Sequence, residues 1–165
     1  MERTGEERVA DGSQCMKEDD VVDNSLAVLP FPISLPTSAS RSYEVMGIRT
    51  DAFCQLFGDR LFVGVSQLNQ KIGNFVMCQA KKSPIDNSVD FHISTVLGNR
   101  EDAMSGVYAR RITERLIKDG IMPDPINLFL GISLRDSGAD PKMFEEVVGI
   151  LYLLIRESLA ITGRQ

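Results

Sequence analysis

The sequence contains few of the residues from which enzymes build active sites. It has one histidine, His92, which falls in the middle of an expected strand, and only three widely spaced cysteines. A zinc site needs several such ligands at short spacing, and general acid–base catalysis needs a partner within reach, so we interpret His92 as structural. The phosphate-binding motifs GxxxxGK[ST] and GxGxxG are absent, as is the GxSxG elbow of hydrolases. We therefore expect no enzyme activity, no metal and no cofactor.

Long apolar runs and a basic surface are missing as well. The longest apolar run, residues 150–155, is far too short to span a bilayer, and the acidic start does not resemble a signal peptide. Of the 23 acidic and 18 basic side chains, the first 24 residues hold eight and three, which leaves 15 of each sign over residues 25–165. A neutral body lacks the clustered positive charge that phosphate binding requires. We expect neither a membrane nor a nucleic acid as a partner.

The cysteines indicate a reducing compartment. An odd and sparse set without a secretion signal does not build a disulfide framework. We interpret Cys54 and Cys78 as small core residues within strands, with a reactive thiol as the less favoured alternative. The expected location is the cytoplasm, with the nucleus as a second location.

The first 40 residues differ in composition from the rest. Residues 1–24 mix charge with Gly and Ser and lack hydrophobic periodicity, so they cannot bury enough apolar surface to offset the entropy of ordering. Residues 26–36 are apolar but contain three prolines, which suits an edge strand or an extended segment at most. We therefore expect a largely disordered acidic tail over residues 1–40 and a single domain over residues 41–165.

The domain is expected to contain five strands. A polar link over residues 37–42 precedes the first strand. A glycine-containing connection follows that strand and predicts a hairpin with the second strand. The strands are predicted at residues 43–57 (bent or broken near Thr50), 61–66, 73–80, 90–97 and 126–133.

Two amphipathic helices are expected. In the first, Glu101 and Asp102 occupy the positive end of the helix dipole and Gly120 follows the last turn. One buried stripe at helical spacing contains Met104, Val107, Tyr108, Ile112 and Leu116. The second helix has Asp140 as N-cap and Pro141 at its first position, and it closes at Gly163.

Two features of the first helix have more than one interpretation. Gly106 marks either the true start of the helix or a close approach to the sheet, and we favour the close approach. Arg110, Arg111 and Arg115 are balanced by Glu114 and Asp119, so we favour a solvated face over a partner contact or an anion site.

This order of elements predicts an α+β fold, a single domain in which an antiparallel sheet carries two amphipathic helices on one face. The apolar residues of 61–65 and 126–132 should lie under the helices, because they alternate along their strands. The opposite face would show Phe62, Val96 and Phe129 beside polar neighbours, and leaving these apolar side chains exposed to water is unfavourable. Two segments could pack on this face: the N-terminal segment around Phe31, or the sheet of a second protein.

One stretch resembles a known family. Residues 93–116 resemble the signature stretch of proteasome assembly chaperone 4, with an S-x-x-L-G segment followed by a glycine-containing helix. Residues 57–66 are similar to the family's strand–turn–strand, and the likeness extends over residues 43–160. The matching positions are Ser94, Leu97, Gly98, Gly106, Ala109, Arg110 and Arg111, with Ile112 where the family has leucine, and Asn74 and Phe75 in the preceding strand.

The resemblance implies a non-enzymatic chaperone. It would form a heterodimer with a chaperone 3-type partner, bind α-type subunits of the 20S core particle and promote assembly of the α-ring. Phe62, Val96 and Phe129 would then be partner contacts. Two other classes stay open: a roadblock- or longin-like scaffold subunit of another complex, and a small-ligand-binding α+β domain.

Overall fold

The computed structural model describes residues 37–57, 60–86, 88–121, 126–135 and 139–162. The chain divides into two units, residues 1–33 and 34–165, and every described residue belongs to the second unit. The predicted acidic tail, the proline-rich segment with Phe31 and the helix end at Gly163 lie outside the described residues.

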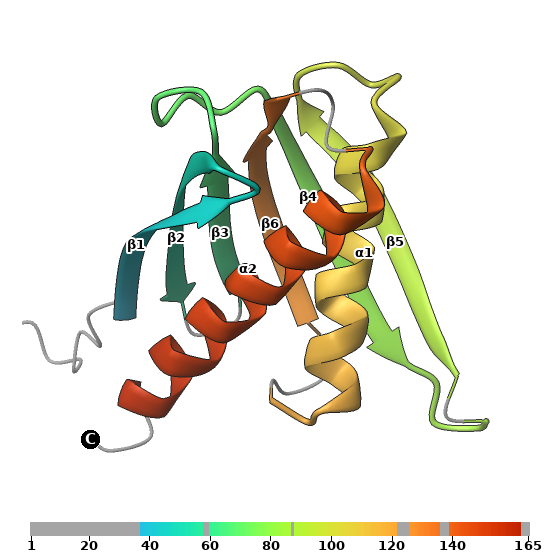
Figure 1. Cartoon of the computed structure of the whole chain (residues 1–165). Helices are drawn as coiled ribbons and strands as arrows, with labels where there is room; N and C mark the ends of the chain where they lie inside the picture. The colour runs from blue at the N-terminus through green and yellow to red at the C-terminus, as the bar shows by residue number, and fades with distance from the viewer. Residues whose placement is uncertain (1–36, 58–59, 87, 122–125, 136–138, 163–165) are drawn as a thin grey trace, which may run out of the picture. The chain divides into compact units, whose positions relative to one another are not determined.

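The described residues form one six-stranded sheet with the order β1-β2-β3-β6-β4-β5. Two helices, α1 and α2, pack on one of its faces (Figure 1). The α+β fold with both helices on one side is therefore confirmed. The bounds are β1 Thr37–Val45, β2 Ile48–Phe57, β3 Arg60–Ser66, β4 Asn74–Lys82, β5 Val89–Leu97, α1 Ala103–Lys118, β6 Ile126–Ser133 and α2 Pro141–Thr162.

One pair of strands departs from the antiparallel expectation. β3 and β6 are parallel, whereas the other four neighbouring pairs are antiparallel. The reason is that β6 lies between β3 and β4 and runs antiparallel to β4. Residues 67–73 therefore span the width of a strand instead of closing a tight hairpin.

The prediction of one long strand over residues 43–57 is wrong. The chain forms the hairpin β1–β2 there, and residues 37–42, expected as a polar link, begin β1. Met46 and Gly47 make the two-residue turn with φ of 50° and 76°. Positive φ at both positions suits the right-handed twist of the flanking strands. Methionine is an unusual residue at such a position, so the turn carries a weak sequence signal.

The core lies between the sheet and the helices. Leu61, Val63 and Leu130 are fully buried there, as the alternation along their strands predicted. Cys54 and Cys78 are buried in the same core and form no disulfide. Because both side chains are buried, the expectation of small core residues is confirmed. Burial also raises the pKa of the Cys54 thiol to about 11.

Helix α1 begins one or two residues later than predicted and is rotated about its axis. Asp102 is the N-cap and its carboxylate accepts a hydrogen bond from the backbone N–H of Met104, which leaves Glu101 outside the helix. Val107, expected in the buried stripe, is 45% exposed. Ser105 and Thr113 take part in the buried face instead, because each hydroxyl finds a partner within the helix or its cap.

Gly106 packs against the sheet, but at an ordinary contact distance that does not require glycine. A Cβ at this position would lie 3.4 Å from Cγ2 of Ile93 on β5. In α2, the backbone N–H groups of Lys142 and Met143 donate to the carboxylate of Asp140, as the expected N-cap requires. Neither helix is both long and apolar enough to cross a membrane over its described residues.

Candidate protein-interaction face

The sheet face opposite the helices carries a row of four phenylalanine rings, one from each of four strands. We call Phe53, Phe62, Phe75 and Phe129 the aromatic row. Ring centroids are 5.5 Å apart for Phe53 and Phe62, 5.2 Å for Phe62 and Phe75, and 5.9 Å for Phe75 and Phe129. These separations favour mutual contact between the rings. Each ring is only partly buried, and the helices lie on the other side of the sheet.

Two glycines leave space on this face of the sheet, one for the Phe53 ring and one for Ile72. Gly64 is paired with Phe53 across β2 and β3, and a Cβ at Gly64 would overlap the Phe53 ring. Gly131 is paired with Gly64 in β6, and a Cβ there would lie 2.9 Å from Cδ1 of Ile72. The glycines therefore make room for Phe53 and Ile72, and the result is a low and continuous apolar surface.

A groove of about 550 Å³ runs beside the aromatic row over β1, β2 and β3. Phe53 and Ile72 contribute its apolar lining, and Ser42 and Asp51 contribute a polar wall. The hydroxyl of Ser42 donates to Asp51 at 2.6 Å and the guanidinium of Arg49 lies 3.1 Å from the same carboxylate oxygen. Both groups lower the pKa of Asp51 below its ordinary value, and the hydrogen bond from the Ser42 hydroxyl has the larger effect. The groove thus combines an apolar floor with a polar wall in which the carboxylate of Asp51 is paired with Arg49.

The structure brings two of the three predicted contact residues together. Phe62 and Phe129 are direct neighbours in the register of β3 and β6. Val96 is 54% exposed but belongs to β5, which β4 separates from β6. No observation tests the role of these residues, so all three stay predicted contacts.

Sequence reasoning missed Phe53 and Phe75. The alternation that buries Cys54 and Val76 points their neighbours Phe53 and Phe75 to the opposite face. That signal was present, but it could be used only after the β1–β2 hairpin and the position of β4 beside β6 were known.

The polar end of the same face contains His92. It lies opposite Gln79 in the register of β4 and β5, and the amide of Gln79 donates to Asn127 at 3.1 Å. Over the described residues, no three histidine, cysteine or acidic side chains come close enough to hold a metal ion.

The residues that carry the family resemblance hold the turn between β5 and α1. The side-chain carbonyl of Asn74 accepts from the backbone N–H of Asn99 at 2.8 Å, and its amide donates to Asp102 and to Ser105. Gly98 has a φ of 105°, and a Cβ there would overlap the carbonyl oxygen of the Asn74 side chain. These motif residues therefore shape the turn.

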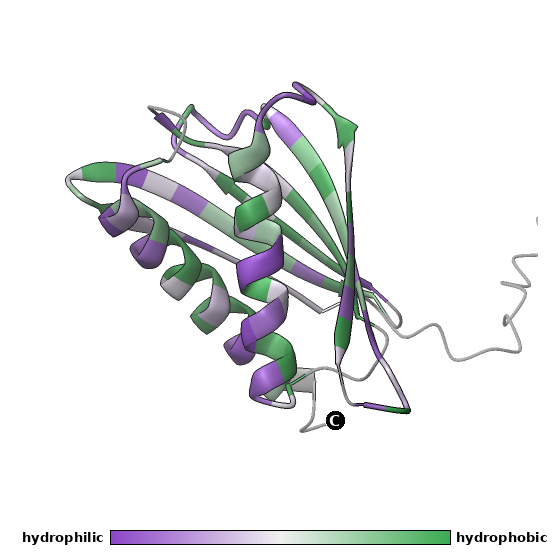
Figure 2. Cartoon of the chain, turned by 90° about the vertical axis from the view of Figure 1, so that its right-hand side faces the viewer, coloured by the Kyte–Doolittle hydropathy of each residue, from purple (hydrophilic) through white to green (hydrophobic). Residues whose placement is uncertain are grey.

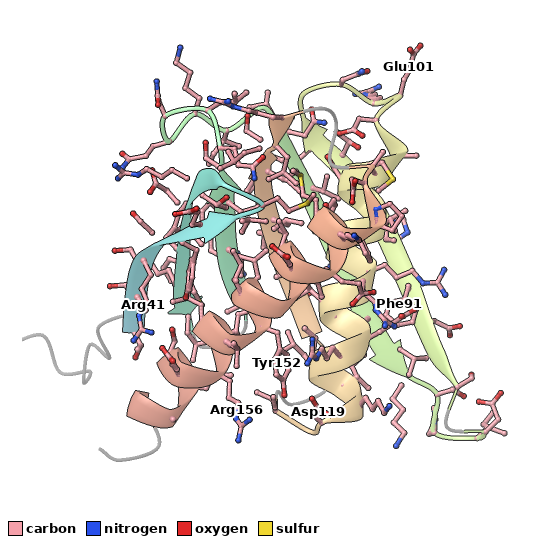
Figure 3. The ribbon with its side chains drawn as sticks, viewed as in Figure 1. Arg41, Phe91, Glu101, Asp119, Tyr152 and Arg156 are labelled. Atoms are coloured by element: carbon pink, nitrogen blue, oxygen red, sulfur yellow. The ribbon has the colours of Figure 1, made fainter. Side chains whose placement is uncertain are left out.

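Arg110 and Arg111 of α1 share Glu114 as a partner, whereas Arg115 contacts an aromatic ring of α2. Arg110 pairs with Glu114 at 2.8 Å and lies 5.1 Å from the ring of Phe91 on β5. Arg115 stacks 4.1 Å from the ring of Tyr152, whose hydroxyl donates to Asp119 at 2.5 Å (Figure 3). Arg111 also lies 3.9 Å from Glu114, so this carboxylate balances the two neighbouring guanidinium groups and the arrangement does not favour an anion site.

Comparison with known proteins gives a family. The model of the proteasome assembly chaperone 3 family matches residues 63–152, which is more than half of the chain. Among curated proteins no sequence matches. A solved chain from a novel chaperone complex for yeast 20S proteasome assembly is similar in fold, with a TM-score of 0.52 and 15% identity over 72% of this chain and 98% of that chain.

The family supports a role in proteasome assembly and agrees with an expectation of non-enzymatic function, and the solved chain shows a likeness in fold. The narrower assignment to proteasome assembly chaperone 4 was not confirmed and stays a prediction. The chain belongs to the proteasome assembly chaperone 3 family.

Proposed function

We propose that the protein is one half of a heterodimer of assembly chaperones. The heterodimer binds α-type subunits of the 20S proteasome in the cytoplasm, and in the nucleus as well, and promotes assembly of the α-ring. The chain performs no catalysis and acts by presenting a rigid surface to a partner of similar fold. The observation that carries this proposal is the aromatic row on the sheet face opposite α1 and α2.

The aromatic row is suited to a second sheet. Complete burial of one phenylalanine side chain stabilises an association by about 1.5–3 kcal/mol, and these side chains are already mostly covered, so each would gain at most about a third of that. Four rings together then contribute at most roughly 2–4 kcal/mol. Strands spaced about 4.8 Å apart give the six-stranded sheet a width of roughly 25 Å, which fits the area of a standard interface of about 800 Å² per partner.

The identity of the partner distinguishes two assignments. The resemblance over residues 93–116 favours a chaperone 4-type role with a chaperone 3-type partner, and we retain it as the finer part of the proposal. Membership of the chaperone 3 family also allows the converse pairing, with a chaperone 4-type partner. Co-expression of the full chain with each partner in turn distinguishes the two pairings.

The proposal is tested by affinity purification of the full chain followed by mass spectrometry. We expect a second small assembly chaperone and α-type proteasome subunits among the captured proteins. Phe62→Glu and Phe129→Glu should abolish capture of the chaperone, because a carboxylate would be buried in the interface. Leu153→Glu is the matched control, since Leu153 is 51% exposed on α2 and should tolerate the charge.

Three results would overturn this function. Capture of the chaperone by Phe62→Glu at the wild-type level would remove the aromatic row as its binding surface. Capture of trafficking or signalling proteins instead would indicate a roadblock- or longin-like scaffold. A small ligand that raises the melting temperature of a stable monomer would identify the groove of about 550 Å³ as a ligand site.

A further inference from the structure

The two edges of the sheet are β1 and β5, and they differ sharply. β1 is protected by polar and charged residues: serine occupies positions 38, 40 and 42, and Arg41 forms an ion pair of 2.9 Å with Glu157 of α2. Helix α2 also packs against β1. Polar side chains and a covering helix are the usual means by which proteins prevent an edge from pairing with another strand.

β5 has less of this protection, although helix α1 packs against it and its register with β4 shifts beside Phe75 and Val76. Asp90 is its only acidic or basic residue apart from His92, and the strand contains no proline or lysine. Of the ten large apolar side chains that are exposed in the described residues, four lie between positions 85 and 97. Those four are Ile85 at 93%, Ile93 at 37%, Val96 at 54% and Leu97 at 69% exposed, and they belong to β5 or to the turn before it.

The chemistry of this edge specifies what binds there. β5 pairs with β4 on one side, and none of the described elements pairs with its other side (Figure 2, in which this edge faces the viewer). The backbone N–H and C=O groups that point away from β4 are satisfied in a regular way only by another extended backbone. A strand of nine residues is long enough to offer a full row of such bonds.

We propose that β5 pairs antiparallel with β5 of a second copy of this chain, about a two-fold axis at Ile93. In that register Ile93 lies opposite its own copy and Phe91 lies opposite Thr95, on the helix side of the sheet. Val89 lies opposite Leu97, which a register shift between β4 and β5 pairs with Phe75 and so removes from the regular alternation. On the other side Asp90 lies opposite Val96, and His92 opposite Ser94. No like charges face each other, and apolar side chains meet across the axis.

Pairing of β5 with β5 of a second copy is more favourable than pairing of β5 with the other edge strand, β1. Pairing of β5 with β1 of another molecule would place exposed apolar residues against serines and the Arg41–Glu157 pair. Such a head-to-tail contact also leaves one edge free on each end molecule and builds rings or filaments, whereas β5-to-β5 pairing closes as a dimer. The surface is distinct from the aromatic row, so the resulting assembly is compatible with two copies of this chain and two chaperone partners.

A cysteine placed on the proposed axis tests the pairing directly. Opposed residues in an antiparallel pair have Cα atoms about 4.5–5.5 Å apart, within the range that a disulfide spans. The full chain with Cys15→Ser and Ile93→Cys should form a covalent dimer under mild oxidation. The matched control, Cys15→Ser with Ser40→Cys on the opposite edge strand β1, should remain monomeric on a non-reducing gel.

The oligomeric state in solution gives a second readout. Analytical ultracentrifugation of the full chain should show a dimer at micromolar concentration, which Ile93→Lys or Leu97→Lys converts to a monomer and Phe62→Glu does not. A chain that is monomeric at every concentration would overturn the inference. So would equal cross-linking at positions 40 and 93, or a dimer that only Phe62→Glu disrupts, which would move the contact to the aromatic row.

Discussion

Replacement of Gly98 by alanine tests whether the turn between β5 and α1 is held by the contacts seen in the structure. The φ of 105° at Gly98 lies in a region that side chains rarely adopt, which costs about 1–3 kcal/mol. The added Cβ would also overlap the carbonyl oxygen of Asn74 and lie 2.6 Å from the backbone oxygen of Gly73. Displacing Asn74 weakens its hydrogen bond from Asn99 and those to Asp102 and Ser105, at about 0.5–1.5 kcal/mol each.

The expected loss is therefore about 2–4 kcal/mol in the free energy of unfolding, a large share of the ~5–15 kcal/mol that a domain of this size has. Gly120→Ala is the matched control. Gly120 has a φ of 61° and no atom within 4 Å of its would-be Cβ, so its replacement should cost only about 1–2 kcal/mol for the backbone. Urea unfolding monitored by circular dichroism measures both variants.

A double-mutant cycle with Asn74→Ala locates the cause. If Gly98→Ala acts by displacing Asn74, then removing the Asn74 side chain should cost less in the Gly98→Ala background than in the wild type. Equal losses for Gly98→Ala and Gly120→Ala, or additive effects of Gly98→Ala and Asn74→Ala, would refute the reasoning that the collision with Asn74 matters.

Three further predictions concern buried groups. Cys54 and Cys78 should resist alkylation at pH 8 until urea unfolds the chain, because burial raises both thiol pKa values, and rapid modification of folded protein would contradict their burial. The free energy of unfolding should fall as the pH rises from about 10 to about 12, because burial raises the pKa of Tyr108 to about 12 while the unfolded phenol ionises near 10. Urea unfolding midpoints measured across this range should fall less steeply for Tyr108→Phe than for the wild type. An unchanged slope would exclude Tyr108 as the source of the fall. Gly64→Ala should displace the Phe53 ring and weaken binding of the chaperone partner at unchanged fold, as measured by titration calorimetry, and wild-type affinity would show that the flatness of the aromatic row is unimportant.

The sequence predicted the buried faces well wherever a strand alternates strictly. Leu61, Val63 and Leu130 are core residues for that reason. Asp140 caps α2, as its position directly before a proline and the apolar helical pattern predicted. Local patterns of this kind report burial, because the period of a strand fixes which residues share a face. They do not report which strands are neighbours.

The missed features depend on contacts between residues that are distant in the sequence. The insertion of β6 between β3 and β4 brings Phe62 and Phe129 together and places Phe75 beside them, and no local pattern contains that order. The exposure of Val107 has a similar origin. Ser105 and Thr113 replace it on the buried face because their hydroxyls donate to Asp102 and Ala109, so burial leaves neither hydroxyl unsatisfied.

The position of the family motif explains why it identifies the fold more readily than the partner. The motif residues Gly98 and Asn74 are in contact at the start of α1, where Asn74 also binds Asp102, and of the motif residues only Phe75 belongs to the aromatic row. A chaperone 3-type and a chaperone 4-type chain of the same fold would both need this turn, so its residues cannot separate them. Partner choice should instead reside in the aromatic row and the groove beside it. Exchanging Phe53 and Phe129 for the residues of a candidate partner, at constant turn sequence, should therefore change which chaperone is captured, and unchanged capture would place the choice elsewhere.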